Sequence, residues 1–473
     1  MNTGQFYING SWVDPLERET FDVINPATEK SAARISMAGT ADVELAVQAA
    51  RRAFPEYMAT TIEQRLDWFS RLLEIYRRRA SEITQAMCTE MGSPLSFTEE
   101  VQTPCGDGHI EVIMEVLAGF EFDTLSPRGG SRILHEPVGV AALITPWNWP
   151  VNQVVVKVLP ALAAGCTCIL KPSEESPLSA MIFAEMIDEA GFPAGAFNLI
   201  NGSGLVAGAT LAAHPDVDMV SFTGSTRAGI AVAKTAADTV KRVTLELGGK
   251  SPNLLFADAD LESAVSWSVE ACFSNAGQTC DAPTRLLVER SVYERAKEIA
   301  ARVAQATKVG DPSEAGDHIG PVVNAKQYDN IQRLIQKGID EGASLLAGGT
   351  GRAEGREVGY FVKPTLFADV DNDMTINKQE IFGPVLCMMP FDTEDEAIRL
   401  GNDTVYGLGA CIQTSDPVRA DRVARKLRAG TISINGAALD YDAPFGGMKQ
   451  SGNGRENGIY GLEDYLDVKT VTA

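Results

Sequence analysis

The sequence predicts an α/β protein built on doubly wound parallel sheets. From about residue 138, short and almost wholly apolar segments recur, which is typical of strands that are buried on both faces. Helical stretches lie between these segments and create repeated strand–helix–strand units. Each strand segment is followed by a loop of Gly, Pro or polar residues, and α/β folds bind their ligands at that end of a strand.

Before residue 138 the pattern is helical. Apolar residues recur at a spacing of three and four along 40–57 and 61–92, which predicts one helix and then a longer helical pair. The strands predicted next lie at 138–145, 166–170, 197–200, 219–223 and 242–248. The helices predicted between them lie at 151–163, 177–190, 204–213 and 226–237. Beyond residue 250 a second α/β segment begins, with a helix that either Asp258 or Asp260 caps.

Composition narrows the classes of partner. The chain has 473 residues, enough for two or three domains, and its net charge is −22 (41 Lys and Arg against 63 Asp and Glu). That charge argues against binding to nucleic acid or to an anionic membrane. The apolar stretches are too short for a bilayer, and the N-terminus lacks the features of a signal peptide, so we expect a cytoplasmic protein. With eight scattered cysteines, four histidines and no C-x-x-C, neither a metal site nor a disulfide is expected.

Cys280 is the candidate nucleophile. It lies in "FSNAGQTCDAPTR", after a Gly-Gln-Thr loop rather than inside an apolar run, which favours access to a ligand. The ordinary alternative is a buried, unreactive cysteine. Asp281 and the C-terminal end of the preceding helix both disfavour a thiolate, so the activation of Cys280 has to come from elsewhere in the chain.

Two further strand-end residues suit acyl chemistry. Glu246, in "TLELGGK", can serve as a general base next to two glycines, although a solvated strand-end carboxylate is the simpler alternative. Asn148, in "PWNWP", can donate its amide to an oxyanion, or it can merely stabilise a turn.

The loop "KPSEESP" has the character of a dinucleotide contact. Lys171 suits a ribose hydroxyl or a phosphate, whereas a carboxylate at Glu174 accepts from an adenosine 2′-hydroxyl and repels a 2′-phosphate. This pattern favours NAD, with NADP as the alternative; the two residues can also form a simple salt bridge. "NGSGLVAG" and "FTGSTRAG" each open a helix that can hold a pyrophosphate, although neither is a G-x-G-x-x-G motif.

Taken together, the motifs resemble those of the aldehyde dehydrogenase superfamily. "PWNWP", "KPSEESP", "FTGST", "ELGGK", "GQTC", "EIFGPV" and "PFGGMKQSG" follow one another in the family's order, and the similarity runs from "YINGSWV" to "DYLDVKTVTA". The resemblance implies an aldehyde dehydrogenase-like α/β fold with two doubly wound parallel-sheet domains and a small β oligomerisation flap. The implied ranges are 1–118 and 138–249 for the cofactor-binding domain, 250–448 for the catalytic domain, and 119–137 with 449–473 for the flap.

The resemblance also assigns roles. Cys280 attacks the aldehyde to form a thiohemiacetal, Asn148 and the Cys280 main-chain N–H hold the oxyanion, hydride passes to the nicotinamide, and Glu246 activates the water that hydrolyses the thioester. Lys157 and Glu456 occupy positions proposed to relay protons. The implied cofactor contacts are Thr145, Pro146, Trp147, Lys171, Ser173, Glu174, Gly204, Gly224, Ser225, Leu247, Gly248, Glu380 and Phe382. The flap implies a homodimer or homotetramer.

Substrate choice is the least constrained feature. By the same resemblance the aldehyde channel is lined by Trp149, Asn152, Gln153, Val156, Thr279, Asp281, Leu439 and Phe445. These residues favour a medium-sized aldehyde with a polar group over a plain fatty aldehyde, and the absence of Arg and Lys disfavours a carboxylate-bearing semialdehyde. Two rivals remain: a CoA-acylating dehydrogenase, against which Glu246 counts, and a non-catalytic binding protein on the same fold.

Overall fold

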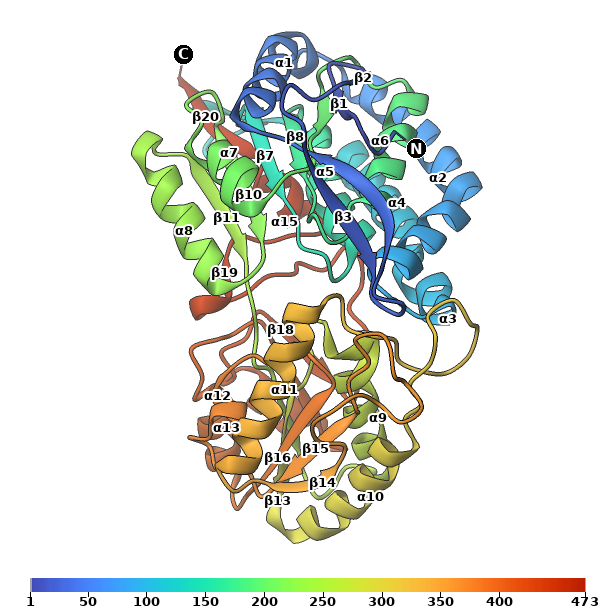
Figure 1. Cartoon of the computed structure of the whole chain (residues 1–473). Coiled ribbons are helices and arrows are strands. Elements are labelled where there is room, and N and C mark those ends of the chain that lie inside the picture. Colours follow the sequence, from blue (N-terminus) through green and yellow to red (C-terminus); the bar gives the residue numbers. More distant parts are fainter. Residues whose placement is uncertain (1, 473) are drawn as a thin grey trace.

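The computed structural model describes residues 2–472, which form two lobes, each built around one large sheet (Figure 1). The sheet of the first lobe has the spatial strand order β19 (Gly452–Asn453), β11 (Arg242–Glu246), β10 (Met219–Thr223), β7 (Val140–Ile144), β8 (Thr167–Lys171), β9 (Phe197–Leu199), β1 (Phe6–Ile8) and β2 (Ser11–Val13). Strands β7 to β11 pair in parallel, and each falls inside or one residue beyond a strand segment predicted from the sequence. The predicted α/β fold class is confirmed.

Helices cover both faces of this sheet. They are α1 (Thr40–Met58), α2 (Ile62–Glu90), α3 (Leu95–Phe97), α4 (Pro104–Gly119), α5 (Pro150–Ala164), α6 (Leu178–Ala190), α7 (Ala209–Ala213) and α8 (Thr226–Ala236), with π-helical turns at Thr98–Gln102 and Gly204–Gly208. One apolar core lies between the sheet and α2, α4, α5 and α6, and another lies beneath α1, α7 and α8.

One early prediction is wrong: 61–92 is not a helical pair. The segment forms the single 29-residue helix α2, which begins at a capping box between Thr61 and Gln64. Neither Gly nor Pro interrupts the helix, and one continuous face of it is buried, so nothing in the segment breaks the run.

The second lobe contains the other large sheet. Its strand order is β14 (Ser344–Ala347), β15 (Thr365–Ala368), β16 (Val385–Phe391), β13 (Arg285–Glu289), β12 (Pro252–Leu255), β17 (Gly409–Gln413) and β18 (Thr431–Ile434). Its helices are α9 (Leu261–Phe273), α10 (Tyr293–Ala306), α11 (Ala325–Asp340), α12 (Thr375–Lys378), α13 (Glu394–Asn402) and α14 (Pro417–Ala424), with 3-10 turns at Ser274–Gly277 and Arg290–Val292. Of the two candidate caps for α9, the structure selects Asp260, whose Oδ1 accepts from the N–H of Ser263 at 3.3 Å.

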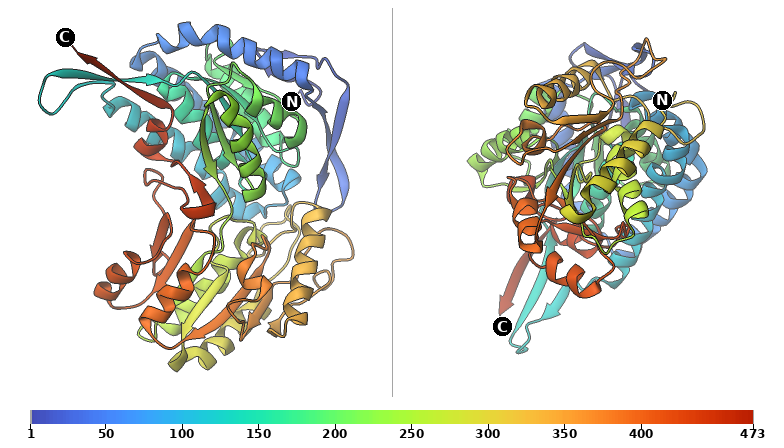
Figure 2. Two further views of the ribbon diagram at one scale, coloured as in Figure 1. Left: turned by 90° about the vertical axis from the view of Figure 1, so that its left-hand side faces the viewer. Right: turned by 90° about the horizontal axis from the view of Figure 1, so that it is seen from below.

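Three antiparallel strands protrude from the first lobe (Figure 2): β20 (Leu466–Thr472), β6 (Ser131–Pro137) and β5 (Asp123–Leu125). These are the segments predicted to pair as a flap. The C-terminal boundary differs from the predicted 449–473, because β19 joins the first sheet and α15 (Gly458–Glu463) packs against α5. The chain reaches β11 because Gly452 has φ +120°, and a Cβ there would lie 1.8 Å from the carbonyl oxygen of Leu245.

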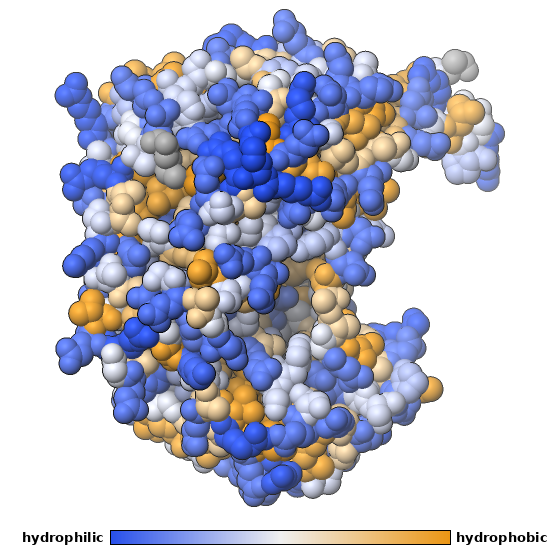
Figure 3. All heavy atoms as spheres, turned by 90° about the vertical axis from the view of Figure 1, so that its right-hand side faces the viewer, coloured by the Kyte–Doolittle hydropathy of each residue, from blue (hydrophilic) through white to orange (hydrophobic). Residues whose placement is uncertain are grey.

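A long hairpin joins the lobes on one side. Strands β3 (Glu19–Asn25) and β4 (Lys30–Met37) form their own two-stranded sheet. At its tip Glu29 accepts hydrogen bonds from Arg352 and from the N–H of Gly359, both in the second lobe. The surface is hollowed between the lobes, below the protruding strands (Figure 3). Within residues 2–472 no helix combines the length and the apolar character needed to cross a membrane.

The second lobe depends on a buried guanidinium. Arg285 is fully buried and donates to the carbonyls of Lys250, Leu400 and Gly401 at 2.9, 3.0 and 2.7 Å. Arg285→Met leaves three buried acceptors without donors, so we expect unfolding to become easier by about 3 kcal/mol or more. Scanning calorimetry of the variant measures this, with Arg290→Met as control because the Arg290–Asp392 pair is exposed. Equal unfolding midpoints for the wild type and Arg285→Met would contradict the assignment.

Candidate active site

The carboxyl ends of the first sheet face the second lobe across a cavity of about 820 Å³. Cys280, Glu246 and Asn148 all line this cavity. So do most of the predicted cofactor contacts, namely Pro146, Trp147, Ser173, Glu174, Gly224, Ser225, Leu247, Gly248, Glu380 and Phe382. Residues 280 and 246 come from different lobes, so the site exists only where the lobes meet.

Cys280 is presented by a turn with unusual backbone geometry. After α9 the chain passes through Asn275, Ala276 and Gly277, which have φ values of +53°, +54° and +72°. Three successive left-handed residues reverse the chain sharply, a conformation that costs energy for residues with a Cβ. Glycine is required at 277, because a Cβ there would lie 2.1 Å from the carbonyl of Gly383.

Buried amides hold this turn against the first lobe. The Asn148 amide donates to the carbonyl of Gln278 at 3.0 Å, and the Asn275 amide donates to the carbonyl of Asn148 at 2.9 Å. Gln102 in turn donates to Asn275 Oδ1 at 3.2 Å. One proton of the Asn148 amide is thus used for positioning and the other is left for a ligand. Sequence reasoning missed Asn275 and Gln278; the two amides flanking a glycine ahead of Cys280 were the available signal.

The Cys280 thiol is protonated in this environment. Burial raises its pKa well above the usual range, and the carboxylates of Asp281, Glu246, Glu380 and Glu456 raise it further. The expectation that Asp281 disfavours the thiolate agrees with this direction.

Glu246 ends strand β11 and is the base candidate. Its side chain is 4% exposed, and neither carboxyl oxygen has a hydrogen-bond partner among the described residues. Burial and then the charge of Glu456 raise the Glu246 pKa well above its ordinary value, while Lys157 opposes the shift. A buried carboxyl without a partner is costly, so its retention in a cavity points to a function.

Lys157 and Glu456 form a buried ion pair behind Glu246. Lys157 Nζ lies 2.5 Å from Glu456 Oε1 and also donates to Ser221 Oγ at 3.1 Å. The structure therefore brings the two predicted relay residues together, although neither lines the cavity itself. Helix α5 carries Lys157, and the segment between β19 and α15 carries Glu456.

Trp147 and Phe382 form one aromatic wall. Their ring centroids lie 5.4 Å apart in an edge-to-face arrangement. Phe382 has φ +58°, and the amide of Gln327 holds this conformation by donating to the Phe382 carbonyl at 2.8 Å. Gln327 belongs to α11, a helix that also lines the cavity. No motif pointed to this helix.

Glu380 lies directly over the glycines of "ELGGK". The N–H of Gly249 donates to Glu380 Oε1 at 3.1 Å, and a Cβ on Gly248 would lie 2.2 Å from Glu380 Oε2. Only glycine at 248 leaves room for this carboxylate. Burial raises the Glu380 pKa to about 7, against the opposing field of Lys250.

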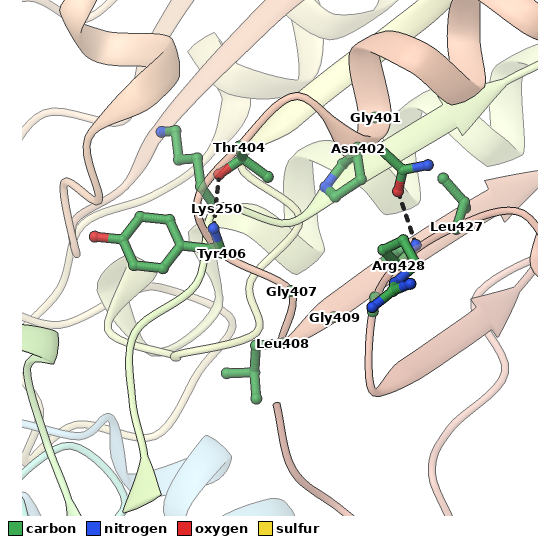
Figure 4. Close-up of a pocket in the computed structure, with 13 residues that line it drawn as sticks. Lys250, Gly401, Asn402, Thr404, Tyr406, Gly407, Leu408, Gly409, Leu427 and Arg428 are labelled. Carbon is green, nitrogen blue, oxygen red and sulfur yellow. Dashed lines mark hydrogen bonds between the residues drawn. The ribbon is translucent and has the colours of Figure 1, made fainter. Parts of the chain in front are cut away.

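A much smaller cavity, of about 10 Å³, adjoins Lys250 in the second lobe (Figure 4). Within its wall the N–H of Tyr406 donates to Thr404 Oγ1 at 3.2 Å, and the N–H of Arg428 donates to Asn402 Oδ1 at 2.7 Å. Lys250 is 1% exposed, and its Nζ has no hydrogen-bond partner within residues 2–472. The space suffices for about one water molecule and is no substrate site.

Lys171 is less available than its predicted role requires. It is 2% exposed, and its Nζ donates to the carbonyls of Pro172 and Gly202, both at 2.7 Å. Glu174 Oε2 lies 3.6 Å from the same Nζ. Unlike Glu174, Lys171 is not in the cavity wall, and neither are Thr145 and Gly204. Ser225 lines the cavity and caps α8 by accepting from the N–H of Ala228 at 3.3 Å.

The predicted substrate residues lie on another side of the turn and do not line the large cavity. Trp149 donates from its indole to Thr279 Oγ1 at 3.1 Å and packs edge-to-face on Phe97. Asp281 packs against Gly409 at the start of β17. Gln153 and Val156 are buried in α5, Asn152 and Phe445 are half-buried, and Leu439 is 42% exposed.

Comparison with known proteins agrees with this geometry. The model of the Aldehyde dehydrogenase family matches residues 12–471. A 3-succinoylsemialdehyde-pyridine dehydrogenase from a Pseudomonas species is 49% identical, covering 99% of this chain and 98% of that protein. The chain belongs to the aldehyde dehydrogenase family, as its motifs predict.

Solved structures give the same answer. The crystal structure of an aldehyde dehydrogenase from Bartonella henselae has a TM-score of 0.98 at 49% identity, covering 99% of this chain and 98% of that one. Aldehyde dehydrogenase C from Pseudomonas syringae, a mutant complexed with NAD+ and octanal, has a TM-score of 0.98 at 48% identity, covering 100% and 97%. The predicted fold and enzyme class, an aldehyde dehydrogenase, are confirmed.

The protonated thiol has a measurable consequence. Without nucleotide, alkylation of Cys280 by iodoacetamide should be slow at pH 7 and should keep accelerating beyond pH 9, the ordinary pKa of a thiol. The reason is that the raised pKa of Cys280 keeps its reactive thiolate scarce at these pH values. Cys280→Ser is the control, since the other seven cysteines are buried. A labelling rate that levels off below pH 8 would contradict the assignment.

Proposed function

We propose that this protein oxidises an aldehyde to the carboxylic acid through a covalent Cys280 intermediate, with NAD as hydride acceptor. The observation that carries the proposal is the meeting of Cys280, Asn148 and Glu246 in one cavity between the lobes. A thiol, an amide donor and a base without a partner are the groups that acyl transfer to water requires.

The cavity fits a dinucleotide. Its volume of about 820 Å³ is in the range of cofactor pockets. The N-terminus of α8 with its Ser225 cap offers N–H groups to a pyrophosphate, and Arg227 lines the cavity beside it. The Glu380 carboxylate over Gly248 offers an acceptor to a ribose hydroxyl, and the Trp147–Phe382 wall offers an apolar surface to a nicotinamide ring. NAD supplies a hydride acceptor when it is bound.

The first chemical stage belongs to Cys280 and Asn148. The Cys280 thiol first loses its proton to a water molecule. The sulfur then attacks the aldehyde carbon and forms a carbon–sulfur bond, while the carbonyl π electrons move to oxygen. The free proton of the Asn148 amide and the main-chain N–H of Cys280 stabilise this oxyanion. When the oxyanion collapses, its electron pair re-forms the carbonyl, the aldehyde hydrogen leaves as hydride, and a thioester remains on Cys280.

The second stage belongs to Glu246. Its unpartnered oxygens can accept a proton from a water molecule, which then attacks the thioester and releases the acid and the thiol. The raised pKa suits this role, because it makes the ionised carboxylate a stronger base than an ordinary glutamate. Lys157 and Glu456, buried behind Glu246, offer a route by which that proton can leave.

The substrate we propose is a medium-sized, uncharged aldehyde with a polar group. No Arg or Lys occurs among the predicted channel residues, so a carboxylate would be desolvated without a counter-ion. One relative fits this class, since it is named for a pyridine-bearing semialdehyde. The other was crystallised with octanal, which has the size but lacks the polar group. A higher kcat/KM for succinate semialdehyde than for neutral aldehydes would contradict this choice.

We further propose a cytoplasmic enzyme that forms a dimer or tetramer through the protruding strands. All eight cysteines are free, as expected in a reducing compartment. Strands β5 and β20 are the outer strands of the protruding sheet, and such edges invite pairing with another chain. Light scattering of the purified protein, with a variant lacking 466–472, tests the assembly.

Glu246→Gln should separate the two stages. Without the base, hydrolysis of the thioester should slow by a factor on the order of 10²–10⁴, while acylation with hydride release continues. Stopped-flow measurement of NADH should show a stoichiometric burst followed by slow turnover.

The matched variant is Asn148→Ala, which should lose about 10²–10³ in kcat and show no burst, because the oxyanion forms before hydride leaves. Cys280→Ser retaining full dehydrogenase activity would refute the mechanism.

Glu174 should set the preference between NAD and NADP. Glu174→Gln removes the charge that repels a 2′-phosphate, so the kcat/KM ratio of NADP to NAD should rise on the order of tenfold. Glu189→Gln is the control, because Glu189 is exposed and pairs with Arg78 on the surface. An unchanged ratio in Glu174→Gln would show that other residues select the nucleotide.

The CoA-acylating alternative makes a different product. If CoA displaced the thioester, adding it would raise turnover and yield an acyl-CoA, whereas we expect free acid at an unchanged rate. Product analysis by mass spectrometry with and without CoA distinguishes the two. The non-catalytic alternative predicts no reduction of NAD with any aldehyde.

A further inference from the structure

We propose that His109 and Asn152 form an uncharged hydrogen-bonding site along the path of the aldehyde. The pair would select aldehydes that carry a neutral polar group several bonds from the carbonyl. This inference rests on the proposed function and gives its substrate class. His109 is not among the residues that sequence reasoning selected, since a lone histidine in α4 carries no signal of its own.

Three separate segments converge at this site. His109 comes from α4, Asn152 from α5, and Tyr441 from the loop between β18 and β19. His109 Nε2 lies 3.1 Å from Asn152 Oδ1. The imidazole also packs edge-to-face on Tyr441, with ring centroids 4.8 Å apart, and the Tyr441 hydroxyl donates to Cys105 Sγ at 3.8 Å. These contacts fix the ring and leave hydrogen-bonding groups spare.

The spare groups can be assigned. Oδ1 of Asn152 only accepts, so Nε2 of His109 carries the proton and Nδ1 is left as an acceptor. The Asn152 amide keeps its N–H donors, and neither side chain has another hydrogen bond within residues 2–472. Burial lowers the His109 pKa to about 4, so the ring is neutral at physiological pH. The pair thus offers donors and an acceptor without a charge.

Asn152 and Gln153 are polar residues in an otherwise mostly apolar part of α5. In α5, Asn152 and Gln153 interrupt a run of valines that extends from Val151 to Val158. Gln153 is 5% exposed, and its Oε1 has no hydrogen-bond partner among the described residues. Unsatisfied polar groups in an apolar helix face are destabilising, so their presence points to a ligand that satisfies them.

The site is at a useful distance from the chemistry. Asn152 and Val156 lie on one face of α5, and Trp149, which immediately precedes the helix, donates to Thr279, the neighbour of Cys280. Asn152 lies in the first turn of α5, four residues after Asn148 in the chain, so the pair can meet a polar group several bonds from the aldehyde carbon. The loop that carries Tyr441 also reaches the catalytic residues. Five residues after Tyr441, a Cβ on Gly446 would lie 2.6 Å from Glu246 Oε1.

Two aldehydes of equal shape provide the test. Hexanal and 4-methoxybutanal differ only by an ether oxygen in place of a methylene, four bonds from the carbonyl carbon. The wild type should favour the ether by about five- to tenfold in kcat/KM, mainly through KM, as one neutral hydrogen bond allows. Propanal is too short to reach the pair and reports the chemistry alone.

The variants separate recognition from folding. Asn152→Leu removes the N–H donors from which an ether oxygen can accept and should bring the ether-to-hexanal ratio to about one. His109→Leu removes the bond that orients the Asn152 side chain and should lower the ratio. In both variants kcat/KM should fall more for the ether than for propanal. His109→Gln, which retains polarity, should restore part of the ratio and covers the case in which the leucine variant fails to fold. His318→Leu, at a half-buried histidine in the second lobe that does not contact His109 or Asn152, is the control and should keep the full preference.

The outcomes are distinct. No preference in the wild type, or equal losses on all three aldehydes in His109→Leu and His109→Gln, would overturn this inference and leave the proposed function intact. Failure of the wild type to reduce NAD with any of the aldehydes would overturn the proposed function, and this inference with it.

Discussion

The hydrogen bond from the Asn148 amide to the carbonyl of Gln278 is the contact on which the site depends. It joins the end of strand β7 in the first lobe to the cysteine loop of the second lobe, at 3.0 Å. The reciprocal bond from Asn275 returns to the Asn148 carbonyl, so neither lobe can shift without breaking both. The three left-handed residues before Cys280 are retained because this buried network over-determines them.

The raised pKa values in the site follow from the same packing of the two lobes against each other. Burial places Cys280, Glu246 and Glu380 in a poorly solvated cavity, and all three have raised pKa values. The carboxylates of Glu246 and Glu380 add to the effect of burial on Cys280, so the ligand-free site favours the protonated thiol. A cationic group entering this cavity would favour the ionised forms of all three, which makes binding and activation a single event. The Lys157–Glu456 pair stays outside the cavity and can exchange protons without occupying ligand space.

Sequence reasoning recovered the parts of the fold that carry periodic signals. The five buried strands and the helices between them were predictable because apolar runs and strand-end loops are local. Helix α2 was predicted as a pair of helices because the segment is long. Its sequence contains no residue that would break the helix, and it forms one helix. Gln327 and Asn275 were out of reach for another reason. Their roles arise from bonds to chain segments far away in sequence, to Phe382 and Asn148, and no local pattern encodes such contacts.

Helix α5 explains how one element can serve several steps. It begins two residues after Asn148, carries Asn152 and Val156 on one face, and holds Lys157 against Glu456. Because a helix fixes the rise and rotation of each residue, Asn152 and the relay residue Lys157 keep a constant spacing. Burial of nearly the whole helix against α4, α6 and the sheet makes it rigid. A substitution on one face can therefore change which aldehyde binds while the chemistry at the helix start is preserved, as a family of enzymes with different substrates requires.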